Sequence, residues 1–146
     1  MESNLVPVTT DSDLDLQERV VDAIGALDVM HGSRAHVVVS VSGGQVTLAG
    51  VLQSPMAAAE VAHAAAQVAG NLPVINLLLD DATLSIQVAE MLSTDPRTAA
   101  ISPGYQVASS YGHIMLIGYF SEPAALAMRA VASTHPGVLS VTIKAL

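Results

Sequence analysis

The side chains best suited to hold a metal ion are five histidines, His31, His36, His63, His113 and His135. No two of them have the spacing by which imidazoles on one helix or loop ligate zinc. The chain has no cysteine, which removes disulfides, thiolate catalysis and Cys-ligated zinc or iron–sulfur sites. We therefore expect no metal site built from these side chains and no cofactor. A cation held by backbone carbonyls would leave no such pattern and stays open.

Residues for phosphate binding or nucleophilic catalysis occur without the motifs that those chemistries need. Ser42-Gly43-Gly44 lacks the Lys-Ser/Thr of a phosphate-binding loop, and a hairpin turn explains it better. Neither Ser40 nor Ser110 lies in a G-x-S-x-G elbow. Three carboxylates on a charged helix are interpreted as a solvated surface, namely Glu18, Asp22 and Asp28. The sequence thus predicts a protein that is not an enzyme.

Aromatic side chains are scarce, at 3% of the residues, and gather in the last third of the chain. Tyr and Met suit surfaces that meet lipid, a small ligand or another subunit. The alternative is that these side chains are core and turn residues of one sheet. The candidate lipid or partner surface consists of Tyr105, Tyr111, Met115, Tyr119 and Phe120.

Charge excludes one class of partner. The 146 residues include 13 acids and 5 bases, and the net charge of -8 has the wrong sign for binding the phosphates of nucleic acids. The same charge opposes attraction to anionic lipid, although an apolar patch or neutral head groups could still be bound. The hydrophobic fraction of 51% supplies a core and excludes intrinsic disorder.

The first residues give an expectation about the compartment. Residues 1–13 lack the basic start and the apolar stretch of about 7–15 residues that a secretory signal requires. As written, the sequence predicts a cytoplasmic protein, whereas a chain from which a leader had been removed would look the same and would be periplasmic. Apolar runs such as Leu77–Leu79 fall far short of the roughly 20 residues of a membrane-spanning helix.

The chain contains an internal repeat. A shift of 68 places brings two hairpin-like segments into register. The identical residues are Val39, Ser42, Gly44, Leu48, Gly50 and Pro55 in the first copy, and Val107, Ser110, Gly112, Leu116, Gly118 and Pro123 in the second.

Each copy predicts the order helix, strand, strand, helix, strand. In the first copy, the strands His36–Val41 and Gln45–Leu52 flank a Gly-Gly turn, an Ala-rich helix runs from Ser54-Pro55 to Gly70, and Val74–Leu79 closes the sheet. The first helix has N-cap candidates in Asp11, Ser12 and Asp13 and an apolar stripe of Leu16, Val20, Val21, Ile24 and Leu27.

The second copy repeats these signals more loosely. A helix with the stripe Leu84, Val88 and Leu92 starts near Asp80-Asp81 and stops at Asp95-Pro96. The predicted hairpin runs from Gln106–Ser109 through Tyr111-Gly112 to His113–Phe120. The last elements are a helix from Ser121 to the stop at His135–Gly137 and a strand at Val138–Ile143.

This order resembles the BON domain, the bacterial OsmY and nodulation domain, over residues 13–146. The hairpin of the first copy is of the V-x-V-x-x-G-x-V-x-L-x-G type, followed by an Ala-rich helix and a Gly-then-Val strand. Its matching residues are Val39, Val41, Gly44, Val46, Leu48, Gly50 and Val51. In the second copy Ser109 replaces an expected apolar residue. The glycines that mark the structural motif are Gly44, Gly50, Gly70, Gly112, Gly118 and Gly137. Similar proteins are commonly periplasmic or membrane-associated, with a proposed role in binding phospholipid.

We therefore predict an α+β protein of two tandem α-β-β-α-β modules, each a three-stranded mixed sheet with two helices packed on one face. The expected organisation is an N-terminal tail at 1–12, a first BON-like domain at 13–79 and a second at 80–146. The predicted function is non-catalytic binding, to phospholipid or a membrane surface. The alternatives are a cytoplasmic protein-interaction or self-associating scaffold, and small-ligand or cation sensing. Because domains of this size are marginally stable alone, we expect the halves to dock or the chain to form a homo-oligomer.

Overall fold

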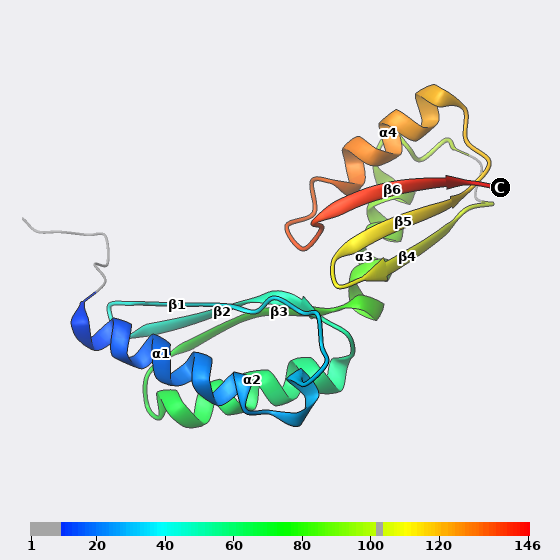
Figure 1. Ribbon diagram of the computed structural model, residues 1–146. Coiled ribbons are helices and arrows are strands. Elements are labelled where there is room, and N and C mark those ends of the chain that lie inside the picture. Colours follow the sequence, from blue (N-terminus) through cyan, green and yellow to red (C-terminus); the bar gives the residue numbers. More distant parts are fainter. Residues whose placement is uncertain (1–9, 102–103) are drawn as a thin grey trace, which may run out of the picture. The chain divides into compact units, whose positions relative to one another are not determined.

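The computed structural model describes residues 10–101 and 104–146 and contains two compact units, which divide between Leu78 and Leu79 (Figure 1). The first unit contains α1 (Asp11–Gly25), the 3-10 helix η1 (Asp28–Met30), β1 (Val38–Ser42), β2 (Gln45–Leu52), α2 (Pro55–Ala69) and all but the last two residues of β3 (Val74–Asp80). The second contains α3 (Asp81–Thr94), β4 (Gln106–Ser110), β5 (His113–Gly118), α4 (Glu122–Ala132) and β6 (Ser140–Ala145). The predicted α+β class and the order of elements in each half are confirmed.

Each unit has one mixed three-stranded sheet, in the order β1-β2-β3 and β4-β5-β6. The hairpins are antiparallel, with Val39 opposite Leu48 in the first unit and Val107 opposite Leu116 in the second. These two pairs are related by the same 68-residue shift as the sequence repeat. β6 runs parallel to β5 and places Ile143 beside Leu116. The second strand of each hairpin therefore lies in the middle of its sheet.

The two helices of each unit pack on each other and on one face of the sheet. α1 contacts α2 and β1, α2 contacts β2, α3 contacts α4 and β4, and α4 contacts β6 (Figure 1). Side chains alternate across a strand, so Val46 and Leu48 of β2 are fully buried whereas Thr47 between them is partly exposed. The described helices cover one face of each sheet and leave the other open.

Both cores are aliphatic. In the first unit Val20 of α1, Leu48 of β2 and Val61 of α2 have no exposed surface. Burying a side chain of this size contributes about 1.5–3 kcal/mol. In the second unit the fully buried large side chains are Leu84, Val88, Leu92, Ile114, Leu116 and Met128, which include the whole predicted stripe of α3.

The start of α1 corrects one prediction. The N-cap is Thr10 rather than Asp11, Ser12 or Asp13, and the helix begins inside the predicted tail. Thr10 Oγ1 accepts the Asp13 N–H at 3.1 Å, while Asp13 Oδ2 accepts the Thr10 N–H at 3.0 Å. This reciprocal arrangement is a capping box, which satisfies two backbone donors at once. α2 begins and ends as predicted, with Ser54 as N-cap, Pro55 at the first position and Gly70 at φ 62° after the last.

The burial of one residue and the ends of two elements also differ from the predictions. Val21, expected in the buried stripe, is exposed because Val20 and Ile24, four residues apart, already face the core. β5 ends at Gly118, so Tyr119 and Phe120 follow the strand rather than belong to it. α4 ends at Ala132, before the predicted stop at His135–Gly137.

Two motif glycines are required by their backbone geometry. Gly50 lies in β2 at φ 142°, and a Cβ there would stand 2.6 Å from the carbonyl oxygen of His36. Gly112 lies in the β4–β5 turn at φ 86°, and a Cβ there would stand 2.9 Å from the carbonyl oxygen of Gly137. Only a residue without a side chain fits either position without strain.

Candidate functional site

The β1–β2 turn is held by a buried carboxylate at the start of α1. Asp13 Oδ2 accepts the N–H of Gly43 at 3.1 Å, and Oδ1 accepts that of Gly44 at 3.0 Å. The backbone donors of Thr10 first, and then of Gly44 and Gly43, hold the pKa of Asp13 below its usual value, against the opposing effect of desolvation. Since both carboxylate oxygens already accept hydrogen bonds, Asp13 has a structural role.

The second unit repeats this arrangement 68 residues later. Asp81, the first residue of α3, accepts the N–H of Tyr111 at 2.8 Å and that of Gly112 at 3.2 Å. Ser109 adds its hydroxyl to the same carboxylate at 2.7 Å. Ser109 stands where the first copy has the buried Val41, so the departure from the apolar pattern is explained by a hydrogen bond. We call these two arrangements the aspartate clasps.

The five histidines do not assemble into a metal site. Across residues 10–101 and 104–146, no three His, Asp or Glu side chains are grouped to hold a metal ion. His113 Nδ1 lies 2.7 Å from Ser140 Oγ on the exposed face of the second sheet. His135 Nδ1 accepts the Gly137 N–H at 2.9 Å, and its Nε2 lies 2.7 Å from Gln87 Oε1. Partial burial lowers the pKa of His135.

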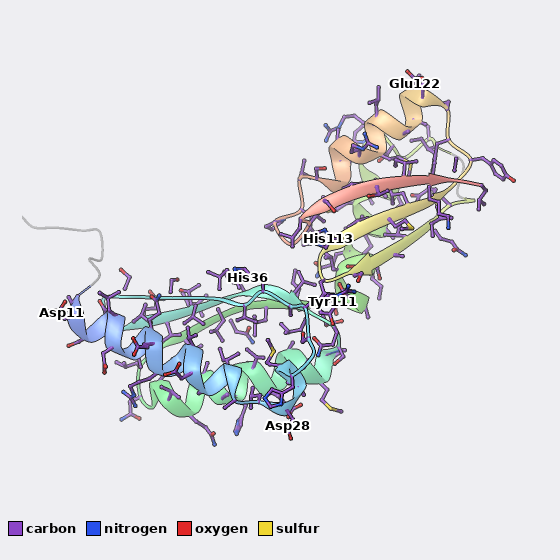
Figure 2. All side chains as sticks on the ribbon, in the orientation of Figure 1. Asp11, Asp28, His36, Tyr111, His113 and Glu122 are labelled. Atoms are coloured by element: carbon purple, nitrogen blue, oxygen red, sulfur yellow. The ribbon has the colours of Figure 1, made fainter. Side chains whose placement is uncertain are left out.

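The aromatic residues of the predicted lipid or partner surface lie at opposite ends of the second hairpin. Tyr105, before β4, packs on Phe120, after β5, with ring centroids 5.9 Å apart, and burial raises the pKa of Tyr105. Tyr119 beside them is 81% exposed. Tyr111 lies in the turn at the other end of the hairpin, about 20 Å away along the six residues of β5. Figure 2 accordingly shows Tyr111 far from Glu122, the residue that starts α4.

Met115 is the one member of that surface which lies on the open face of the second sheet. It is 38% exposed and stands between Ala108 of β4 and Thr142 of β6. Two residues before and after Met115 on β5, His113 lies beside Ser140 of β6 and Ile117 lies beside Lys144. The open face of the second sheet is therefore mixed, with polar and ionisable groups around a single exposed methionine.

The open face of the first sheet has a different character, which the sequence analysis did not single out. Its large apolar side chains, Val38, Ile75 and Leu77, are 49%, 41% and 57% exposed. Smaller uncharged residues complete it, because Val38 pairs with Ala49 and Ser40 pairs with Thr47. Figure 2 shows this face pointing away from α1 and α2, with His36 just before β1 on the same side. We call the set Val38, Ser40, Thr47, Ala49, Ile75 and Leu77 the first open face.

Two surface hollows are too open to enclose a small molecule. The larger, of about 530 Å³, lies at the start of α1 beside Gly44 and Leu72 and is lined mainly by Asp11, Asp13, Asp15 and Arg19. The smaller, of about 380 Å³, lies between α3 and β4 and is lined by Ser85, Ile86, Ala89, Tyr105 and Val107. Ligand sites usually bury most of the ligand surface, which an open hollow does not do. The described helices also include none that is long and apolar enough to cross a membrane.

Both units are thus small α+β folds in which an aspartate holds the hairpin turn and one face of the sheet is uncovered. Residues 12–79 match the family model of the BON domain. The chain therefore contains a BON domain, which coincides with its first unit. The match covers the first unit, and a second BON domain at residues 80–146 stays a prediction, which rests on the repeated fold and the second aspartate clasp.

No curated protein sequence matches this chain. Among solved structures, the chain is similar to CdsD, a structural protein of the type III secretion system of Chlamydia trachomatis, with a TM-score of 0.56 and 18% identity over 90% of this chain and 60% of that one. It is also similar to the C-terminal domain of CdsD, with a TM-score of 0.61 and 16% identity over 92% of this chain and 67% of that one. The chain thus spans about three fifths of the first structure. At such identities the likeness shows the fold alone.

Proposed function

We propose that this chain is a non-catalytic binding module that acts as a scaffold, with a protein surface as its partner. The observation that carries the proposal is the first open face, a flat sheet surface with exposed Val38, Ile75 and Leu77 and no charged side chain. Apolar side chains on an uncovered face gain free energy when a partner removes them from water. The two CdsD structures, which belong to a structural protein, support a scaffold role by analogy of fold.

Charge favours a protein over a lipid surface as the partner. Anionic lipids attract clusters of Lys and Arg. The chain has five such residues among 146, and the first open face has none. An uncharged face can instead meet another uncharged protein face without desolvating an ion.

A phospholipid surface is the second candidate, because this role is proposed for BON domains and one observation favours it. Tyr119 is 81% exposed beside the Tyr105–Phe120 pair, and a tyrosine in that position can insert its ring among lipid head groups. The net charge of -8 restricts this candidate to neutral lipid.

A photo-cross-linking experiment tests the proposed function. The full chain carries the photoreactive residue benzoylphenylalanine in place of Leu77, is irradiated in living cells, and is analysed by mass spectrometry for covalent adducts. We expect adducts to protein from position 77, and none from the control position Glu60, which is exposed on α2. Adducts to lipid alone, or equal yields from both positions, would contradict the proposal.

Vesicle flotation decides between the two candidates. We expect the chain to stay unbound with both neutral and anionic phospholipid vesicles. If the chain floats with neutral vesicles and Tyr119→Ala abolishes this, the lipid candidate replaces the protein one. The matched control is Tyr111→Phe, which keeps a ring in the turn at the opposite end of the hairpin.

A further inference from the structure

The charged side chains described between residues 10 and 78 all lie outside the strands of the first sheet. Residues 1–78 contain eight acids and two bases, a net charge of -6, and none of the nine that the structure describes belongs to β1, β2 or β3. The one acid in these strands is Asp80 at the end of β3, which is buried and caps α3. Four of the acids, Asp11, Asp15, Glu18 and Asp22, are exposed on α1, on the opposite side of the sheet from the first open face. The acidic side of the unit and its uncharged apolar side are therefore separate surfaces.

This separation determines which partner the first open face fits. A basic partner would be attracted to α1 rather than to the sheet, and anionic lipid would be repelled by the unit as a whole. A second copy of the chain is equally acidic, so two copies approach with least repulsion when both present their uncharged faces. The exposed Val38, Ile75 and Leu77 then bury one another.

We propose that the first open face binds the same face of a second copy, which gives a two-fold symmetric dimer. This inference rests on the proposed function and names its partner. Open sheet faces pack about 10 Å apart with their strands turned by about 30°. In a two-fold interface each patch contacts its own equivalent, so the apolar side chains of one face meet those of the other and the hydroxyls of Ser40 and Thr47 can pair across it.

The size of the face sets the strength of this association. Three strands about 4.8 Å apart and five to eight residues long cover roughly 300 Å². Stable complexes bury about 800 Å² on each partner. Because this area is smaller than that of a stable complex, the dimer is weak and its population depends on protein concentration.

Sedimentation velocity of the full chain, from about 5 µM to 1 mM, tests the dimer. We expect a concentration-dependent shift from monomer to dimer that Leu77→Lys weakens at least about tenfold, because two-fold symmetry places two lysines in the interface. Two matched controls leave the shift unchanged, Met115→Lys on the open face of the second sheet and Met56→Lys on α2. All three positions are exposed, and an unchanged circular dichroism spectrum confirms that each variant folds.

Other results overturn the inference. A monomer at every concentration overturns it, as does a dimer that Leu77→Lys leaves intact or one that Met115→Lys disrupts equally. If the cross-linker at position 77 captures a different protein while the chain sediments as a monomer, the inference fails and the proposed function stands. If position 77 gives no protein adduct and the chain is a monomer, both fail.

Discussion

The two units share the hydrogen bonds that hold their hairpin turns, but they differ in the side chains on the open faces of their sheets. Both have an aspartate clasp, with Asp13 on the β1–β2 turn and Asp81 on the β4–β5 turn, and both have the same hairpin register. The open face of the first sheet is uncharged, with exposed Ile75 and Leu77, whereas that of the second carries His113 and Lys144. A repeated domain can thus keep its internal hydrogen bonds and differ in the surface that it offers to a partner.

The clasps also differ in detail. Asp13 stands at the third position of α1 and adds the N–H of Thr10 to its two turn donors. Asp81 stands at the first position of α3 and adds the hydroxyl of Ser109. The turn itself begins with Gly43 in the first unit and with Tyr111, at φ 51°, in the second. A tyrosine in this left-handed region is strained, so the second clasp has more strain to offset.

The largest expected effect is a loss of stability on substituting Gly50, and it should exceed the loss at Gly118, the other glycine inside a strand. Gly50→Ala places a Cβ 2.6 Å from a backbone oxygen at φ 142°, and we expect it to destabilise the first unit by at least about 1–3 kcal/mol. Gly118→Ala meets Tyr105 Cβ at 3.0 Å and the end of the Phe120 ring at 3.2 Å without a positive φ, so its loss is smaller. Urea denaturation, with hydrogen exchange to assign the loss to a unit, measures both. Equal losses would mean that the two copies use this glycine in the same way.

A smaller loss of stability is expected when either of the two aspartate clasps is weakened. Asp13→Asn and Asp81→Asn each replace one accepting oxygen with an amide NH2, and we expect each to lower the thermal midpoint and to increase hydrogen exchange at Gly44 or Gly112 of the affected turn. Since the pKa of Asp13 is lower when the chain is folded, its charged form stabilises the first unit above about pH 3.8. This stabilisation is lost as the pH falls through the folded-state pKa. The Asp13→Asn variant should lack that part of the acid dependence, and an unchanged profile would refute the role of the charge.

The smallest expected effect is a pH dependence of stability that arises from His135 and belongs to the second unit only. Its lowered pKa means that the folded chain binds fewer protons than the unfolded chain, so stability is complete above about pH 6.5 and falls as the pH decreases through the folded-state pKa. Protonation also removes the acceptor of the Gly137 N–H. Thermal midpoints from about pH 7.5 to 5 should therefore decrease in the native chain and change less in His135→Gln. A decrease of the same size in that variant would rule out His135 as its source.

Local signals in the sequence predicted most of the fold. Ser54-Pro55 and Gly70 mark both ends of α2, the Gly43-Gly44 pair marks the first turn, and Leu84, Val88 and Leu92 predict the buried side of α3. Each of these signals acts within one or two turns of the backbone, where residue type and spacing are sufficient.

Long-range contacts were not predictable in this way. The turn that Asp13 holds lies 30 residues further along the chain, so nothing near Asp13 distinguishes its carboxylate from those of Asp11 and Asp15. The first open face was missed for a related reason, because Val38 and Leu77 share a face only once β1 and β3 lie in one sheet. Tyr111 and Tyr119 were grouped by sequence proximity, whereas the length of β5 separates them.

Near the division between the units, β3 (Val74–Asp80) is followed directly by α3 (Asp81–Thr94), with no linker residue between them. Asp80 ends β3 by its backbone, while its carboxylate accepts the N–H and the hydroxyl of Thr83 at 2.9 and 2.8 Å and so caps α3. A protease needs an extended stretch of several residues that is free of such bonds. Limited proteolysis would therefore not release intact halves at this point, and any separate expression of the two units must include Asp80 in both.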